Sequence, residues 1–332
     1  MSSTQTGLAI GLDIGTSRIV AAAPVSGQDL YEAQLNAFVT IPYSKLTEKS
    51  LQREAVPHAV SGDQLIVYGN ESAQMADLLG REIRRPMTRG VLNANEPESL
   101  VQMESILGSV LKAAPRASKL CFSVPAPQLG QEGDLTYHEA TIRQILEKLG
   151  FTGTLSLNEG LAVIYAELED SNYTGIGVSC GGGLCNVAVA YMSIPVFSFS
   201  VAKGGDFIDQ AAANVTGEMI NRVRIVKEGN FHFNGHYTDK VQQALTVYYD
   251  DMIQSVVEGL KTAFQLSRNV PKVGRSVPLV LSGGGVLPSG FRERFEKTLK
   301  TANLPIAISE VRVAAHPLYS TAKGTLVYAL SE

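Results

Sequence analysis

Three glycine-rich turns, each entered from an apolar run with strand character, constrain this chain more than any other feature. They read Asp13-Ile-Gly-Thr-Ser-Arg18, Ser179-Cys-Gly-Gly-Gly183 and Ser282-Gly-Gly-Gly285. Glycine has no Cβ, so it tolerates positive φ and lets backbone N–H groups approach an anion closely. One such turn needs only a geometric reason, because many tight turns use glycine. Three turns of this kind, each after a predicted strand, indicate a nucleotide held from several sides.

Length and composition are those of a soluble protein with two domains or one large bilobed unit. The 332 residues are 45% hydrophobic and 18% charged, which permits a sizeable core. The net charge of −4 and the absence of a long basic run argue against direct nucleic-acid binding. No signal peptide is visible and no apolar run approaches the roughly 20 residues of a spanning helix, so we expect a cytoplasmic protein. The cysteines are expected to be packing thiols of a reduced protein, and they are Cys121, Cys180 and Cys185.

The apolar pattern predicts an α/β protein whose two halves begin alike. Each half opens with a strand, a glycine turn, a second strand and then a third, starting at residue 8 in one half and at residue 175 in the other. We interpret this similarity as an ancient internal duplication. A less regular stretch over 34–67 predicts a small inserted subdomain. Helices are predicted over 70–79, 97–114, 137–149, 159–168, 238–266, 291–301 and 321–330, and strands over 8–13, 18–24, 119–124, 154–157, 175–179, 186–192, 197–202 and 277–281. The region from 207 to 227 is left open as helix or loop.

Two such halves would face each other across a cleft, with phosphates between their turns and the third turn close to the base or ribose. This arrangement resembles the actin-like ATPase superfamily of actin, Hsp70 and the sugar kinases, in which duplicated RNase H-like domains surround a nucleotide cleft. The resemblance implies a first domain of residues 1–165 plus 311–332, with an inserted subdomain at about 32–80. It implies a second domain of residues 166–310, with a subdomain at about 206–270.

The resemblance also implies a role for each turn. The family uses the aspartate of its first phosphate motif to hold Mg²⁺ through water, which matches Asp13. It places the residue that orients the attacking water where this chain has Glu159, the catalytic candidate. The implied cofactors are ATP and Mg²⁺, with GTP left open. The implied nucleotide-binding residues are Gly15, Thr16, Ser17 and Arg18 of the first motif, Gly181, Gly182 and Gly183 of the second, and Gly283, Gly284, Gly285 and Val286 of the adenosine motif.

Further stretches resemble the bacterial actins of the MreB and MamK type. Residues 85–92 are similar to their Arg-Pro-Leu-x-Asp-Gly-Val segment, and residues 122–125 to their Val-x-Val-Pro strand end. Residues 203–209 match their Gly-Gly-Asp-x-x-Asp motif, and residues 322–324 match the start of their closing helix. The resemblance therefore spans about the whole chain, in the family's order.

The second phosphate motif departs from the family pattern Asp-x-Gly-x-Gly-Thr-x-Asp/Glu. Here Ser179 replaces the first acid, Leu184 the threonine and Asn186 the last acid. A backbone N–H cradle needs only the glycines and survives these changes. Metal positioning and water activation depend on carboxylates. The sequence thus predicts that nucleotide binding is retained and that hydrolysis is slow or altered.

Four of the candidate residues also fit simpler roles. Asp13 can be a turn residue that bonds its own backbone, and Glu159 can be an acid that interacts with a helix dipole. Glu218 and Arg222 resemble the Glu-x-x-x-Lys/Arg pair that embraces adenosine in bacterial actins. The insertion before them is short, so solvated surface charge accounts for this pair equally well.

Two other patterns are weak. His232 and His236 have the spacing of a helical metal pair, but the Asn-Gly between them favours a turn and no third ligand is evident. Gly175-Ile-Gly177 begins a dinucleotide fingerprint, but a strand follows where that motif needs a helix. A Rossmann oxidoreductase is therefore disfavoured.

Three functions remain open from the sequence. The leading hypothesis is a bacterial actin-like cytoskeletal protein that binds ATP in the interdomain cleft and self-associates into filaments, with membrane or cargo adaptors left open as partners. The second is a non-hydrolysing adaptor or scaffold of the division or pilus-assembly type, which Ser179 and Asn186 favour. The third is a small-molecule kinase of the same fold, although such kinases are usually longer and no substrate motif is visible.

Overall fold

The computed structural model describes the chain over residues 9–25, 27–116, 118–129, 135–229, 231–233, 235, 237–267 and 276–332. Its first five-stranded sheet has the order β10-β9-β1-β2-β3. Three strands form an antiparallel meander, and they are β1 (Ala9–Ile14), β2 (Arg18–Val25) and β3 (Gln28–Leu35). The other two run parallel to β1, and they are β9 (Lys119–Val124) and β10 (Leu155–Asn158).

A second five-stranded sheet, of order β13-β12-β11-β14-β15, repeats this topology. Its antiparallel strands are β11 (Gly175–Cys180), β12 (Cys185–Tyr191) and β13 (Ile194–Val201), and its parallel strands are β14 (Val277–Ser282) and β15 (Ile308–Val313). Every residue of β11 and β14 is buried, as expected for central strands covered on both faces. The shared strand order agrees with the internal duplication that we predicted.

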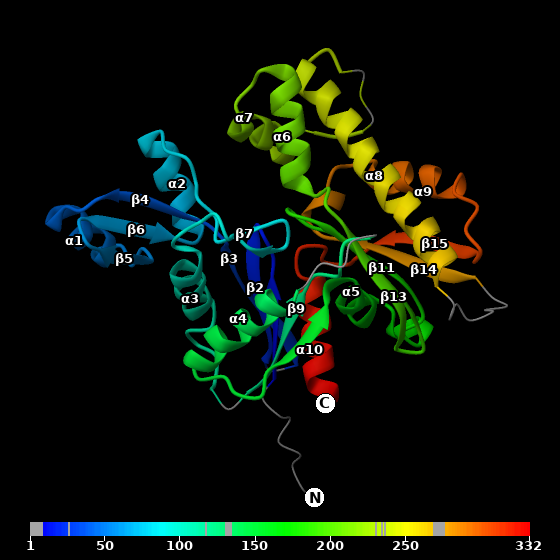
Figure 1. Ribbon diagram of the computed structural model, residues 1–332, viewed down its shortest axis with the longest axis horizontal. Coiled ribbons are helices and arrows are strands. Elements are labelled where there is room, and N and C mark those ends of the chain that lie inside the picture. The colour runs from blue at the N-terminus through cyan, green and yellow to red at the C-terminus, as the bar shows by residue number, and fades with distance from the viewer. Residues whose placement is uncertain are drawn as a thin grey trace, which may run out of the picture.

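Two helices lie side by side between the sheets, α5 (Glu159–Glu167) and α10 (Ser320–Ser331) (Figure 1). α10 packs on the first sheet, where a Cβ on Gly11 would lie 2.1 Å from the backbone oxygen of Ala322. α5 packs on β11 and β12 of the second sheet. The two sheets are therefore joined through one helix pair.

Small residues set the close spacing of these layers. A Cβ on Gly324 would lie only 1.8 Å from the carbonyl oxygen of Ala162, so α10 and α5 touch backbone to backbone. A Cβ on Gly160 would lie 2.6 Å from the backbone nitrogen of Ala188, which brings α5 equally close to β12. Glycine is required at such positions because any side chain would push the layers apart.

The outer faces of both sheets are covered by further helices. On the first sheet these are α3 (Ser99–Val110) and α4 (Thr136–Lys148), whose buried side chains share one apolar cluster with β1 and β9. On the second sheet these are α8 (Lys240–Leu266) and α9 (Phe291–Lys300), whose buried side chains share a cluster with β11 and β14. All three cysteines are buried and form no disulfide, as expected of packing thiols.

Two smaller groups of elements extend from the sheets (Figure 1). One is a three-stranded sheet of order β4-β6-β5 with its own apolar cluster, at residues where we predicted an inserted subdomain. The other packs α6 and α7 against α8. The bounds are β4 (Phe38–Pro42), α1 (Lys45–Arg53), β5 (His58–Ser61), β6 (Gln64–Tyr68), α2 (Asn70–Leu79), β7 (Met87–Thr88), β8 (Val91–Leu92), α6 (Gly205–Thr216) and α7 (Ile220–Gly229).

The predicted helices and strands all have counterparts in the structure, with bounds that shift by a few residues. The apolar pattern missed α1 and β15. Among the described residues, no helix combines the length and apolar content that crossing a membrane requires.

Candidate functional site

A cavity of about 730 Å³ lies where the three glycine turns meet. Its volume falls in the range typical of small-molecule sites. Three of the residues assigned from the sequence, Val286, Glu218 and Arg222, are not in its described lining. The assigned residues that do line it are Asp13, Gly15, Thr16, Ser17, Arg18, Glu159, Gly181, Gly182, Gly183, Gly283, Gly284 and Gly285.

The first two turns have the same backbone closure. Gly15 N donates a hydrogen bond to Arg18 O at 2.9 Å, and Gly181 N donates one to Leu184 O at the same distance. Each turn joins two antiparallel strands, β1 to β2 and β11 to β12. The duplication therefore extends to the hydrogen bonding of the turns themselves.

These two turns pack directly on each other. A Cβ on Gly182 would lie 2.9 Å from the Cβ of Ser17, and a Cβ on Gly183 would lie 2.4 Å from Thr16 Oγ1. Thr16 Oγ1 also accepts a hydrogen bond from Gly90 N at 2.9 Å. The glycines are thus needed for the two halves of the molecule to approach, whatever the cavity binds.

Four backbone N–H groups at these turns are free. Within the described chain, the N–H groups of Thr16, Ser17, Gly182 and Gly183 donate no hydrogen bond to another protein group. Backbone N–H groups are strong donors that structures nearly always satisfy, by water or ligand where protein does not. Successive free N–H groups in a turn form a concavity that suits an anion.

The third turn lies against the end of β11, beside the second. Gly283 has φ +89°, and a Cβ there would lie 2.3 Å from the carbonyl oxygen of Cys180. Gly283 N and Ser282 Oγ both donate to Pro317 O, at 2.9 and 3.0 Å. The turns that follow β1 of the first sheet and β11 and β14 of the second therefore meet at one place, at the carboxyl ends of these strands, where α/β proteins bind ligands.

Asp13 lies at this edge of β1 and is anchored by a serine of β9. Its Oδ1 accepts a hydrogen bond from Ser123 Oγ at 2.9 Å, and Ser123 Oγ accepts one from Ile14 N at the same distance. Burial raises the pKa of Asp13 to about 6, although the hydrogen bond from Ser123 opposes this shift. Asp13 Oδ2 accepts no hydrogen bond from the described residues, so it is open toward a ligand.

Glu159 is held by the two residues that replace the family's acids. Its Oε2 accepts hydrogen bonds from Asn186 Nδ2 at 2.9 Å and from Ser179 Oγ at 3.3 Å. The backbone N–H of Ala126 donates to Asn186 Oδ1 at 2.8 Å, which leaves the amide Nδ2 facing the carboxyl group. Burial raises the pKa of Glu159 to about 8, and the nearby charge of Asp13 adds to the shift. Glu159 is therefore mostly protonated at neutral pH.

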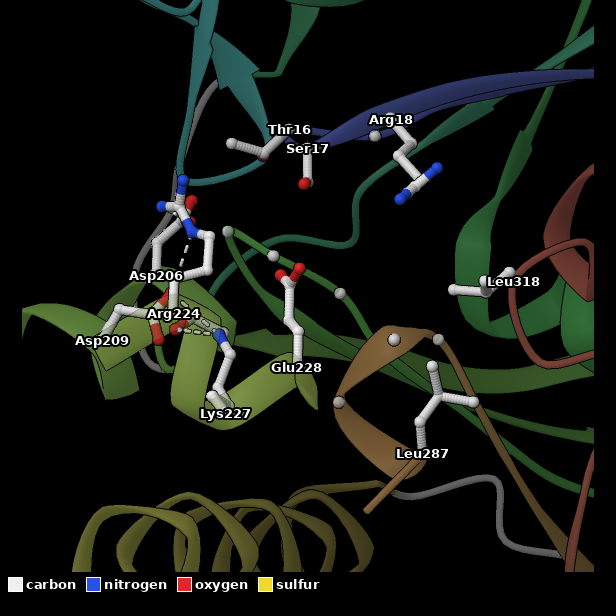
Figure 2. Close-up of a pocket in the computed structure, with 18 of the residues that line it drawn as sticks. Thr16, Ser17, Arg18, Asp206, Asp209, Arg224, Lys227, Glu228, Leu287 and Leu318 are labelled. Atoms are coloured by element: carbon white, nitrogen blue, oxygen red, sulfur yellow. Dashed lines mark hydrogen bonds and ion pairs between the residues drawn. The ribbon is translucent and has the colours of Figure 1, made fainter. Parts of the chain in front are cut away.

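A cluster of paired charges forms another wall of the cavity (Figure 2). Arg85 Nη1 contacts both carboxylate oxygens of Asp206 at 2.9 Å, which links a segment near the first sheet to α6. The buried carboxylate of Asp209 contacts Arg224 at 3.2 Å and Lys227 at 2.8 Å. Residues 85–92 and 203–209 are segments that resemble bacterial actins, but no side chain of this charge cluster was among the site residues predicted from the sequence.

The adenosine pair expected from the sequence lies elsewhere. Glu218 and Arg222 form an ion pair with each other at 3.3 Å, and Glu218 forms a second one with Lys240 at 3.0 Å. Glu228, in α7, instead projects into the cavity (Figure 2). The adenosine role of Glu218 and Arg222 remains a prediction without support from the lining.

Val286 is buried in the apolar cluster of the second sheet, directly after the third turn. The histidine-pair hypothesis cannot be followed, because His236 lies outside the described residues. Among the residues that the structure describes, no group of three His, Cys, Asp or Glu side chains is placed to hold a metal ion.

Two sheets of one topology, joined through a helix pair and meeting at three glycine turns, define the two-domain α/β architecture of the actin-like ATPases. The predicted fold class is confirmed. The chain belongs to the volactin family, whose sequence model matches residues 8–329.

Solved structures match the chain along nearly its whole length. A MamK double helical filament is 19% identical with a TM-score of 0.73, and the match covers 97% of this chain and 98% of that one. MreB 5 of Spiroplasma citri bound to AMPPNP is 14% identical with a TM-score of 0.69, covering 98% and 96%. The ethanolamine utilization protein EutJ from Carboxydothermus hydrogenoformans is 16% identical with a TM-score of 0.57, covering 97% and 90%. No curated protein sequence matched the chain.

A nucleotide fits this site better than a magnesium ion does. The free N–H groups of the two turns suit phosphate oxygens. Mg²⁺ prefers carboxylate and water oxygens in octahedral geometry. Ser179 and Asn186 direct donors at Glu159, where the family pattern has acids, and among the described residues beside the two phosphate turns the open carboxylate oxygen is that of Asp13, while Glu228 lines the cavity from α7. The donor set at these two turns is therefore poor for Mg²⁺.

Proposed function

We propose that this chain binds a nucleoside triphosphate, ATP in the first instance, in the cavity between its two halves. The observation that carries the proposal is the set of four free N–H groups on two turns that face each other. Two relatives in fold, a non-polymerising MamK mutant and MreB 5, are described as bound to AMPPNP, which supports a triphosphate ligand. The cavity volume of about 730 Å³ accommodates a ligand of that size.

We further propose that the nucleotide-bound protein self-associates into filaments in the cytoplasm, as an actin-like cytoskeletal protein. The support is the fold, which this chain shares with a MamK double helical filament along nearly the whole length of both chains. In this proposal residues 1–165 plus 311–332 and residues 166–310 are the two domains that close on the nucleotide. Membrane or cargo adaptors remain further partners to be sought.

Hydrolysis is expected to be slow because the catalytic candidate is neither free nor ionised. Glu159 accepts hydrogen bonds from Asn186 and Ser179, and its pKa is raised to about 8. A carboxyl group that is protonated at neutral pH cannot take a proton from an attacking water. General-base catalysis typically contributes about 10²- to 10⁴-fold, so its loss slows turnover by a similar factor.

A second function, a non-hydrolysing adaptor or scaffold on the same fold, is favoured by the same contacts. Ser179 and Asn186 do more than remove two acids, because both donate hydrogen bonds that pin Glu159. A site arranged in this way uses the nucleotide as a bound structural ligand. This hypothesis requires tight binding without turnover and without polymer.

One set of measurements separates the two functions. Electron microscopy of the pure protein with ATP, with a non-hydrolysable analogue and without nucleotide is combined with phosphate release on the same samples. Nucleotide-dependent filaments support the cytoskeletal function, and tight binding with neither filaments nor turnover supports the adaptor. Wild-type hydrolysis as fast as that of a Ser179→Asp variant contradicts the slow-hydrolysis argument. Absence of nucleotide binding overturns both functions.

A further inference from the structure

The positions that would carry metal-associated acids are occupied by hydrogen-bond donors. Ser179 Oγ and Asn186 Nδ2 both donate to Glu159 Oε2. Ala126 N fixes the amide by donating to its other end, so Asn186 cannot turn its oxygen toward the cavity without losing that bond. Glu159, Ser179 and Asn186 are each at most 8% exposed. The site is therefore built to satisfy a carboxyl group internally, with no cation needed.

Among the residues that the structure describes, the cations that line the cavity are paired, with one exception. Arg85 pairs with Asp206, and Arg224 and Lys227 both pair with Asp209. Arg18, the first residue of β2, makes no ion pair or side-chain hydrogen bond with any described residue. Figure 2 shows its side chain projecting from the first turn into the cavity.

An unpaired guanidinium beside the first turn suits phosphate chemistry. Guanidinium groups bind phosphate oxygens through two parallel N–H donors and remain charged at any physiological pH. Arg18 immediately follows Thr16 and Ser17, whose backbone N–H groups are free. Its charge therefore acts on the same phosphate oxygens that the turn would bind.

We propose that the cavity binds the triphosphate of its nucleotide without a divalent cation, and that Arg18 supplies the positive charge that a metal ion would otherwise supply. The inference rests on the proposed nucleotide binding and specifies the form of the ligand as the metal-free triphosphate. It accounts together for the missing acids of the second turn and for Arg18, a lining arginine that has no partner among the described residues.

The test compares ATP binding by isothermal titration calorimetry in excess EDTA and in millimolar Mg²⁺, with protein first dialysed against EDTA. The expected dissociation constants agree within about 3-fold, because the charge-assisted hydrogen bonds come from protein groups. Binding that appears only with Mg²⁺ overturns the inference and leaves the proposed function standing. Binding in neither buffer overturns the proposed function and the inference with it.

Variants then test the role of Arg18. Arg18→Met is expected to weaken ATP binding in EDTA by about 10- to 100-fold, the usual effect of losing hydrogen bonds to a charged group. Arg18→Lys is expected to restore part of the affinity. The matched control is Arg53→Met in α1, where the side chain is 75% exposed and pairs only with Glu54. Unchanged binding by a folded Arg18→Met protein overturns the assignment.

A reverse variant restores one missing acid. In Asn186→Asp, one carboxylate oxygen still accepts the bond from Ala126 N, while the other replaces the amide donor that faces Glu159 Oε2. ATP binding by this variant is expected to weaken in EDTA and to recover at least about 10-fold with Mg²⁺, since the added carboxylate supplies a hard oxygen ligand. The same affinity in both buffers contradicts the argument that these donors set the metal independence.

Discussion

The contact between α5 and α10 makes a sharp prediction about stability, because at Gly324 the two helices meet backbone to backbone. A Cβ added at Gly324 would lie 1.8 Å from the oxygen, 2.4 Å from the carbon and 2.7 Å from the Cα of Ala162. None of these atoms belongs to a side chain that can rotate away. Gly324→Ala therefore forces the two helices apart or distorts one of them.

The size of the effect follows from the distances. Side-chain carbons essentially never approach other heavy atoms closer than 3.0 Å, so the 1.8 Å contact requires a separation of about 1.2 Å. Overpacking a close-packed interior costs about 1–3 kcal/mol, and sometimes more. Replacing glycine by alanine within a helix returns about 0.5–1 kcal/mol. Because the clash is with backbone atoms, we take the overpacking cost at the upper end, about 3 kcal/mol, and the expected net loss in the free energy of unfolding is about 2 kcal/mol.

A matched control is available in α3. Gly108 is also inside a helix, but its added Cβ would meet only Leu149 Cδ2, at an ordinary 3.5 Å. Gly108→Ala is therefore expected to raise the free energy of unfolding by about 0.5–1 kcal/mol. Glycine-to-alanine substitution is thus expected to change the free energy of unfolding in opposite directions at two helical glycines of one chain.

The assay is urea denaturation followed by far-ultraviolet circular dichroism, with wild type and both variants in one series. The midpoint of Gly324→Ala is expected below that of the wild type, and the midpoint of Gly108→Ala above it. A Gly324→Ala protein at least as stable as the wild type would refute the argument, because the helices would then have to be less closely packed than the backbone distances state.

Three further predictions concern the cavity. The pKa of Glu159 lies near 8 in the folded protein against an ordinary 4.5, so the folded state holds more protons and stability falls as pH rises through this interval. Glu159→Gln should reduce that slope in denaturation midpoints measured across it, and an unchanged slope contradicts the assigned pKa. Asp206→Asn removes the ion pair with Arg85 and should lower the free energy of unfolding by about 1 kcal/mol at low salt and by less at high salt. A loss that does not depend on salt contradicts an ion-pair contribution. Gly183→Ala, which sets a methyl group against Thr16, should weaken ATP binding more than about 10-fold by calorimetry, and wild-type affinity would show that the turns need not touch.

Local patterns predicted most of the regular structure. The helix predicted over 238–266 occurs as α8 at 240–266, because its apolar residues recur with helical period and face one cluster. α1 (Lys45–Arg53) was missed because Leu51 is its only buried residue, which leaves no apolar stripe to detect. β15 (Ile308–Val313) was missed for the same reason, since Val311 alone is buried in it.

The site was partly predictable, for a different reason. The glycine turns could be recognised from the sequence, because three glycine turns in one chain, each after an apolar strand, are typical of phosphate binding. No comparable sequence motif indicates which side chains of α7 face the cavity. Glu218 and Arg222 were assigned by spacing from a family motif, but they pair with each other while Glu228 lines the cavity.

The sequence by itself determined the two hairpin turns and the third turn, because each depends on residues that are neighbours along the chain. Only the tertiary structure decided what Ser179 and Asn186 do. They lie 20 and 27 positions from Glu159, and strand pairing and helix placement bring their donors to its carboxyl oxygen. The sequence marked these residues as lost acids. The folded chain makes them hydrogen-bond partners, because a largely buried carboxyl group needs partners from the protein itself.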